Sequence, residues 1–208
     1  MSVLSSNGVR AAMREPELAH RLVITPLLDP ARQIQDASVD LRLGTEFLVP
    51  TRTDVSLLDP HKSGHAAEVK KVFRSFHVGL ADTFVLHPKQ FVLGATLEYV
   101  RFPHDLMGYV EGRSSWGRNG LQIATATVVS PGFAGVLTFE ISNVGEVPVR
   151  LRTGTRIAQM VIHRLDGAED RYAAKSGAQF RIPTRPEVAT FETDPDRTLL
   201  DNVEKANS

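Results

Sequence analysis

Short runs of β-forming residues follow one another through the middle of the chain, and glycine or proline separates most of them. The runs cover residues 83–86, 91–100, 106–111, 121–129, 136–142, 147–151 and 157–164. Many short strands with turn signals between them are typical of β-sandwiches and β-barrels. Because 208 residues is the length of one domain rather than two, the pattern predicts a single all-β domain over residues 1–208.

A helical pattern precedes these strands. Residues 5–22 place apolar side chains near one face of a helix, and the hydroxyl of Ser5 or Ser6 can cap its first turn. Pro16 removes a backbone donor from the segment and is expected to divide it into two short pieces. The sequence therefore predicts a short N-terminal helical segment beside the β-rich core.

The next segment has the period of a strand. Residues 38–43 alternate polar and apolar side chains, which indicates a half-buried strand. Gly44 and Thr45 are expected to turn the chain before strand character resumes at 46–49. Further along, a turn at 87–90 is expected to join the runs on either side of it into a hairpin.

Two segments are polar. Residues 51–71 are rich in His, Ser and Lys, and we expect a surface excursion in which His61 and His65 are exposed to solvent. Residues 166–208 lose apolar density and end in a polar tail, which predicts a flexible C-terminal arm. The core is accordingly expected to span residues 5–165.

The composition argues against several classes of function. The chain has no cysteine, which removes disulfides, thiolate nucleophiles, iron–sulfur clusters and cysteine-bound zinc. Its 24 Lys and Arg residues balance 24 Asp and Glu residues, so nucleic acid is not an expected partner. The seven histidines show no metal-ligand spacing. Neither a membrane span nor the apolar run of a secretory signal is recognisable, so a cytoplasmic location is expected.

The densest cluster of special residues is the segment 111–120, which reads EGRSSWGRNG. Glycines let backbone N–H groups approach a ligand, serine hydroxyls donate hydrogen bonds, and Arg113 and Arg118 can each hold a pair of phosphate oxygens. These residues are what an anion site needs, but the same composition also suits a plain surface turn with exposed arginines. From the residues alone, both interpretations stay open.

A carboxylate lies in the run 136–142. The run alternates apolar with polar side chains, which places Glu140 on the face opposite the core. Taken alone, such a strand carboxylate is more often solvated than catalytic. The sequence contains no Walker loop, dinucleotide fingerprint or Gly-x-Ser-x-Gly elbow that would direct the interpretation elsewhere.

Five blocks of sequence, taken together and in order, are more specific than any one of them. They are the segments 37–44 (ASVDLRLG), 84–108, 111–120, 130–143 and 152–160. Together they resemble the dCTP deaminases of the trimeric dUTPase-like superfamily, and the likeness extends over residues 5–182. It implies a dUTPase-like β-barrel or jelly-roll-type core, the β-clip, in a homotrimer whose active sites are shared between neighbouring subunits.

The resemblance also implies roles for residues of the 111–120 segment. It assigns the binding of the triphosphate and the lining of the reaction centre to Arg113, Ser114, Ser115 and Arg118. Within this group, Ser114 and Arg118 would hold the attacking water and the developing charge.

Further roles fall on the 130–143 block and the arm. The resemblance makes Glu140 the catalytic acid/base, and it places Thr138 and Phe139 where backbone cradles the pyrimidine. In the C-terminal arm, the residues implied to close over the nucleotide are Tyr172, Lys175 and Gln179.

The implied reaction is the zinc-independent hydrolytic deamination of dCTP to dUTP and ammonia, with Mg²⁺ bound to the triphosphate. Water adds at C4 of cytosine, and a proton must reach the leaving amine. Without a metal to lower the pKa of water, a carboxylate has to take this proton and pass it on. Whether dTTP acts as a feedback inhibitor is left open.

The chain departs from the family pattern in three places. Ser130 stands where Asp usually precedes Pro-Gly, Trp116 replaces the common Leu, and the stretch from Arg118 to Ser130 is one residue shorter. Ser130 is still expected to contact substrate, but a hydroxyl cannot act as a carboxylate. This counts against the bifunctional alternative, which converts dCTP to dUMP. Glu140 counts against a plain dUTPase, and a nucleotide-binding protein without catalysis is the remaining alternative.

Overall fold

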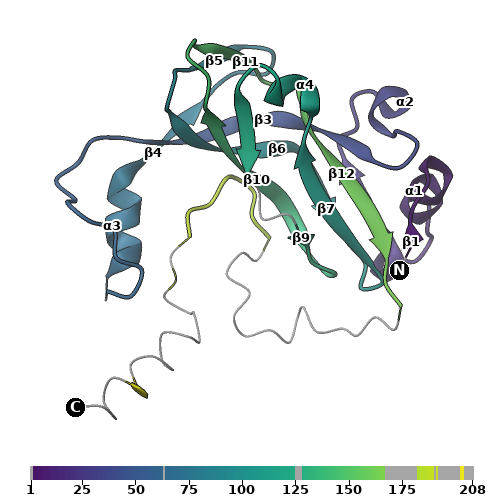
Figure 1. The fold of residues 1–208 in the computed structure, drawn as a ribbon. Helices are drawn as coiled ribbons and strands as arrows, with labels where there is room; N and C mark the ends of the chain where they lie inside the picture. The colour runs from purple at the N-terminus through teal and green to yellow at the C-terminus, as the bar shows by residue number, and fades with distance from the viewer. Residues whose placement is uncertain are drawn as a thin grey trace.

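Antiparallel strands make up most of the fold (Figure 1). The structure is a computed structural model, and it describes residues 2–62, 64–124, 128–166, 182–189, 191 and 202–203. Within that part of the chain, ten strands form one curled sheet, whose longest path runs β8–β10–β6–β3–β12–β7–β9, and β5 pairs with β11 in a second sheet. The strands are β1 (Ser2–Val3), β2 (Val23–Thr25), β3 (Val39–Pro50), β4 (Phe73–His77), β5 (Thr83–Leu86), β6 (Phe91–Arg101), β7 (Leu106–Gly112), β8 (Leu121–Ala124), β9 (Val128–Val129), β10 (Ala134–Asn143), β11 (Val149–Arg152) and β12 (Arg156–Arg164). The all-β prediction is confirmed.

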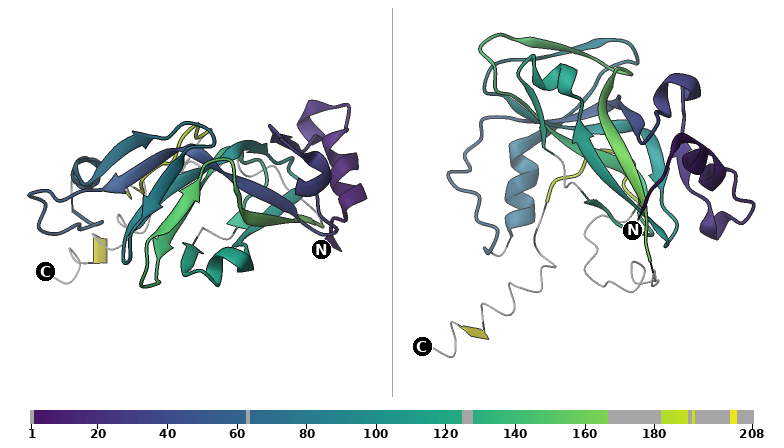
Figure 2. Two further views of the ribbon diagram at one scale, coloured as in Figure 1. Left: turned by 90° about the horizontal axis from the view of Figure 1, so that it is seen from above. Right: turned by 45° about the vertical axis from the view of Figure 1, so that its right-hand side comes forward.

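Short helices lie at both ends of the sheet (Figure 1, Figure 2). At one end are α1 (Ser6–Met13), η1 (Leu18–His20) and α2 (Pro30–Gln33), and at the other is α3 (His65–Val72). The Oγ of Ser5 caps α1 by accepting a hydrogen bond from the Gly8 N–H at 3.3 Å, and α1 ends before Pro16, as predicted. Within the described residues, no helix is long and apolar enough to cross a membrane.

Strand β3 is continuous over twelve residues, so the predicted turn at Gly44 and Thr45 is wrong. Its first part pairs with β12 and its last part with β4, while β6 pairs along the middle with a register shift. A Cβ atom at Gly44 would lie 2.9 Å from the carbonyl oxygen of Ala95. The glycine therefore marks a close approach of the paired strands β3 and β6, at the register shift between them, rather than a reversal of the chain.

The predicted hairpin of residues 83–100 is also wrong in its pairing. The turn forms, with the Gln90 N–H donating to the His87 carbonyl at 3.1 Å. Beyond it the strands part, because β5 pairs with β11 and β6 pairs with β10, β3 and β2. The local sequence therefore determined the turn and the extended conformation of both strands, whereas segments distant in sequence supplied their hydrogen-bonding partners.

The polar segment 51–71 contains most of helix α3, and one expectation about it is wrong. His61 is exposed as predicted, but His65 is only 3% exposed. His65 shares the inner side of α3 with Ala66 and Val69, which are also buried. These three residues occupy positions i, i+1 and i+4, which lie on the same side of a helix, so His65 is buried together with its apolar neighbours.

Candidate functional site

A cavity of about 540 Å³ lies among β9, β10, α3 and the described part of the C-terminal segment. Its polar side chains include Ser130, Thr138, Glu140 and Glu187. The rest of the wall is largely apolar and comes from residues such as Val69, Phe91, Leu93, Val128, Val136 and Val188. A largely apolar concavity with few polar groups is typical of small-molecule sites.

The alternation of β10 sets which side chains reach this cavity. Leu137, Phe139 and Ile141 are buried, whereas Glu140 is exposed, which confirms the predicted faces of the strand. Thr138 and Glu140 share the cavity-facing side. Phe139, between them, is fully buried and does not line the cavity. The arrangement puts the Glu140 carboxylate in a largely apolar cavity that the hydroxyl groups of Ser130 and Thr138 also line.

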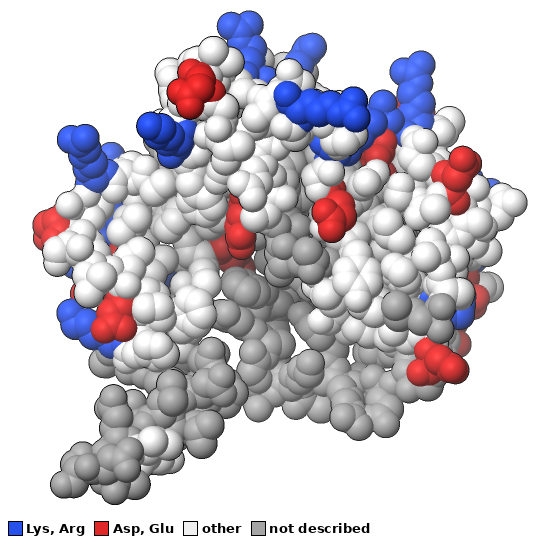
Figure 3. Space-filling view, in the orientation of Figure 1, with Lys and Arg blue, Asp and Glu red and all other residues white. Residues whose placement is uncertain are grey.

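The segment predicted to bind phosphate forms helix α4 (Ser114–Gly117) between β7 and β8. Three hydrogen bonds hold it: Arg113 N–H to the Ile157 carbonyl at 2.9 Å, Trp116 Nε1–H to the Arg156 carbonyl at 3.0 Å, and Asn119 Nδ2–H to the Ser115 carbonyl at 2.8 Å. Ser114, Ser115 and Arg118 are exposed. Basic side chains gather over α4 and β11 on the face shown in Figure 3.

The structure places the predicted site residues in two groups. Ser130, Thr138 and Glu140 line the 540 Å³ cavity, whereas Arg113 and Ser115 line a separate pocket of about 320 Å³. Among the described residues, no side chain lines both. The arm residues of the prediction, Tyr172, Lys175 and Gln179, lie outside the described residues.

Another part of the arm contributes to the cavity wall. The carbonyl of Pro183 accepts a hydrogen bond from the Val136 N–H at 2.7 Å, and the Glu187 N–H donates to Thr138 Oγ1 at 3.3 Å. Pro183 and Pro186 are buried. Burial also raises the pKa of the Glu187 carboxyl, against a smaller effect of Arg185. Residues 182–189 thus extend along the start of β10 beside the Glu140 cavity.

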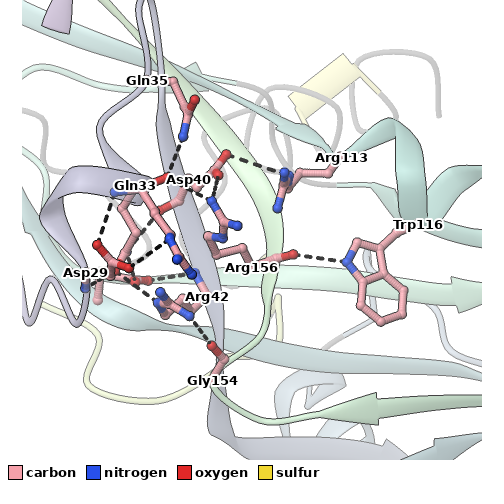
Figure 4. Close-up of polar contacts among 11 residues, drawn as sticks. Asp29, Gln33, Gln35, Asp40, Arg42, Arg113, Trp116, Gly154 and Arg156 are labelled. Carbon is pink, nitrogen blue, oxygen red and sulfur yellow. Dashed lines mark hydrogen bonds and ion pairs between the residues drawn. The ribbon is translucent and has the colours of Figure 1, made fainter.

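An ion-pair cluster around Asp40 holds the base of α4, and sequence reasoning missed it. The Nη1 of Arg156 lies 2.9 Å from Asp40 Oδ2, and the Nε of Arg113 lies 3.7 Å from Asp40 Oδ1 (Figure 4). The Asp40 side chain is 3% exposed. Two guanidinium groups therefore compensate one buried carboxylate. The sequence signal that could have indicated this cluster is Asp40 itself, a charged residue among the apolar residues of the segment ASVDLRLG.

A second buried carboxylate, Glu98, lies in the same network. Its Oε1 accepts from Gln33 Nε2 and its Oε2 from the Arg42 N–H, both at 2.9 Å. Burial raises the pKa of Glu98 to about 7, although these hydrogen bonds lower it. Gln33 Nε2 also donates to the backbone carbonyl of Asp40 at 3.2 Å, so this amide links the Glu98 carboxylate to the backbone beside the other buried acid.

Comparisons with known proteins agree with this architecture. The dCTP deaminase-like family model matches residues 3–165. The dCTP deaminase of Natronomonas pharaonis is 41% identical over 194 residues, covering 92% of this chain and 96% of that protein. The "dCTP deaminase, dUMP-forming" of Halobacterium salinarum is 39% identical over the same shares.

A solved structure is similar in fold. The crystal structure of 2'-deoxycytidine 5'-triphosphate deaminase from Agrobacterium tumefaciens aligns with a TM-score of 0.58 and 24% identity. The alignment covers 78% of this chain and 48% of that chain, so this chain spans about half of its length. With the family match over residues 3–165 and the two relatives near 40% identity, the comparisons establish that this chain belongs to the dCTP deaminase-like family.

Proposed function

We propose that this protein catalyses the hydrolytic deamination of dCTP. The observation that carries the proposal is the position of Glu140 in a largely apolar cavity beside Ser130 and Thr138. A cavity of about 540 Å³ is within the range of nucleotide-sized sites. Relatives that align with over nine-tenths of the chain are named for this reaction.

In the proposed mechanism, Glu140 moves the protons. Its carboxylate accepts a proton from the water whose oxygen bonds to C4 of cytosine and passes it to N3. It then takes the proton of the new C4 hydroxyl and delivers it to the amine, so that the C4–N bond breaks and the uracil carbonyl and ammonia form. The apolar wall excludes other water and strengthens these electrostatic interactions. The hydroxyls of Ser130 and Thr138 are placed to orient the nucleoside.

We propose dUTP as the product. Relatives named for dCTP deamination alone and relatives named as dUMP-forming both resemble the chain at about 40% identity. Formation of dUMP requires a second water to be activated for attack on a phosphate. The cavity presents the Ser130 hydroxyl after β9, where the family pattern has a carboxylate. A hydroxyl is a poor base at neutral pH, and this favours release of dUTP.

We propose that the active unit is a homotrimer in which α4 of one subunit completes the cavity of the next. The support is the separation of Arg113 and Ser115 from the Glu140 cavity in one chain. Exposed Ser114 and Arg118 would then meet the triphosphate and the developing charge across the interface.

The proposed reaction uses no zinc, and Mg²⁺ would arrive with the substrate. The chain has no cysteine, and no group of three or more His, Asp or Glu side chains in the described residues is placed to hold a metal ion. The ligands of Mg²⁺ would be phosphate oxygens and water, where it neutralises part of the triphosphate charge.

The direct test is incubation of the protein with dCTP and Mg²⁺, followed by chromatography of nucleotides and an assay for ammonia. We expect dUTP and ammonia in equal amounts, and no conversion of added dUTP. Accumulation of dUMP would replace the proposed product with that of a bifunctional enzyme. Release of no ammonia from dCTP by folded protein would contradict the proposed function.

A further inference from the structure

One buried polar atom of the Glu140 cavity has no hydrogen-bond partner in the part of the chain that the structure describes. His65, the first residue of α3, is 3% exposed and lines the cavity. Its Nδ1 is buried and has no hydrogen-bond partner among the described residues. The centroid of its ring lies 6.0 Å from that of the Phe191 ring. Buried polar atoms are nearly always hydrogen-bonded, so an unpaired one calls for a physical explanation.

The local structure does not require a histidine at this position. Helix α3 is preceded by Gly64 with no side-chain cap, and Ala66 and Val69 supply the buried apolar contacts of the same face. An apolar residue at 65 would fill the space without leaving a polar atom unpaired. The imidazole nitrogen is therefore explained better by something that enters the cavity than by the packing of α3.

The composition of the cavity indicates which part of a nucleotide enters it. Among the described residues, no Lys or Arg lines the cavity, while two carboxylates, Glu140 and Glu187, do. A triphosphate would meet uncompensated negative charge there. Arg113, a cationic residue of the predicted site, lines the other pocket. A nucleoside, with a planar ring and a few hydrogen-bonding groups, matches the apolar wall and its isolated polar atoms.

We propose that His65 is a substrate-contacting residue whose Nδ1 hydrogen-bonds the nucleoside part of the nucleotide held at Glu140. The inference rests on the proposed function and extends it, since it adds His65 of α3 to the residues that contact the nucleoside. His65 would contribute to affinity and to recognition of the nucleoside, while proton transfer stays with Glu140.

The test measures binding by calorimetry in Glu140→Gln protein, which is expected to hold dCTP without converting it. The ligands are dCTP, deoxycytidine and inorganic triphosphate. His65→Leu should weaken dCTP and deoxycytidine about tenfold, the effect of one lost hydrogen bond, and leave triphosphate unchanged. His65→Asn should retain affinity within about threefold, because its amide occupies the place of Nδ1 and can replace that hydrogen bond. His61→Leu, at an exposed site outside the cavity, is the matched control.

The outcomes separate this inference from the proposed function. Unchanged binding of dCTP by a folded His65→Leu protein overturns the role of His65 and leaves the deaminase proposal intact. Equal weakening of all three ligands overturns the assignment to the nucleoside. If the Glu140→Gln parent is folded and binds none of them, both proposals fail. Where His65→Leu does not fold, His65→Asn is compared with His65→Gln, whose amide mimics Nε2, and equal affinities overturn the inference.

Discussion

At the scale of single residues, two glutamates on neighbouring strands show how burial gives the same carboxyl group different roles. Glu140 on β10 is exposed in an open cavity, whereas Glu98 on β6 is fully buried and receives hydrogen bonds from Gln33 and Arg42. The first is accessible to water and substrate, which proton transfer requires. The second is enclosed by protein and ties β6 to β3, so its protonation affects folding rather than turnover.

Replacing Glu140 with glutamine should separate binding from chemistry. An amide keeps the size of the side chain but cannot carry a proton between water and amine, so kcat should fall about 10³–10⁴-fold with little change in dCTP affinity. Steady-state ammonia release and calorimetry measure the two effects. Glu146→Gln, at an exposed carboxylate outside the cavity, should behave like wild type. Near-normal turnover by Glu140→Gln would remove this residue from the mechanism.

Glu98 should make the stability depend on pH. Burial raises its pKa from 4.5 to about 7, so the folded state holds this proton more tightly than the unfolded state does. The Glu98 contribution to the free energy of unfolding should therefore fall as pH rises from 4.5 to about 7 and stay constant above, by at most about 3 kcal/mol. Urea denaturation at pH 5 and pH 8 measures this difference. It should shrink in Glu98→Gln, and an unchanged difference in that variant would contradict the assignment.

At the scale of elements, β10 organises the candidate site because both of its ends are tied to other segments. At its start, Val136 bonds to Pro183 of the C-terminal segment. At its end, Asn143 Nδ2 donates to the carbonyls of Leu86 and Val147 at 3.0 and 2.8 Å. Between these anchors the strand pairs with β6 and β8. The side chains of Thr138 and Glu140 are thus presented from a backbone held on both edges.

Gly135 should be essential for the docking of residues 182–189. Its φ is +153°, and a Cβ atom there would lie 2.8 Å from the Pro183 carbonyl oxygen. Gly135→Ala should push this segment from β10, raising hydrogen exchange in residues 182–189 and weakening dCTP binding about tenfold or more. Gly117→Ala, where a Cβ meets nothing within 4 Å, is the control for the exchange measurement. Unchanged exchange in residues 182–189 of Gly135→Ala would show that the segment tolerates the methyl group.

At the scale of the whole molecule, the residues of the proposed site lie in two separate pockets of one chain. The Glu140 cavity and the α4 pocket share no lining residue within the described chain. The base of α4 is fixed by Arg113 and Arg156 against buried Asp40. Because that helix is anchored to its own subunit, we expect it to reach a substrate through assembly rather than by moving across its own sheet.

Subunit mixing tests this arrangement. Co-expressed Glu140→Gln and Arg118→Ala chains, each inactive alone, should form mixed trimers in which some interfaces pair an intact cavity with an intact α4. With random assembly at equal amounts, about a quarter of wild-type activity should return. Ser114→Ala mixed with Arg118→Ala, both altered in α4, should not recover. An absence of recovery in the first mixture, with trimers present by light scattering, would contradict a shared site.

The sequence by itself determined the polar–apolar alternation of the strands, the ends of α1 and the family of the chain. Alternation along β10 placed Glu140 opposite the core, Ser5 and Pro16 bounded α1, and the ordered blocks around 111–120 and 130–143 identified the family. These features are local, because side-chain alternation, capping and motif spacing depend on residues a few positions apart. For that reason they could be predicted from the chain alone and were confirmed.

Only the tertiary structure decided which local elements meet. It made Gly44 a close approach between the paired strands β3 and β6 instead of a turn, and it gave β5 the partner β11. It also buried His65 in the wall of the Glu140 cavity. Strand pairing and burial depend on contacts between segments tens of residues apart, and side-chain alternation is the same whichever strand lies alongside. The residues therefore encode their own conformation locally, while their partners are selected by the packing of the whole chain.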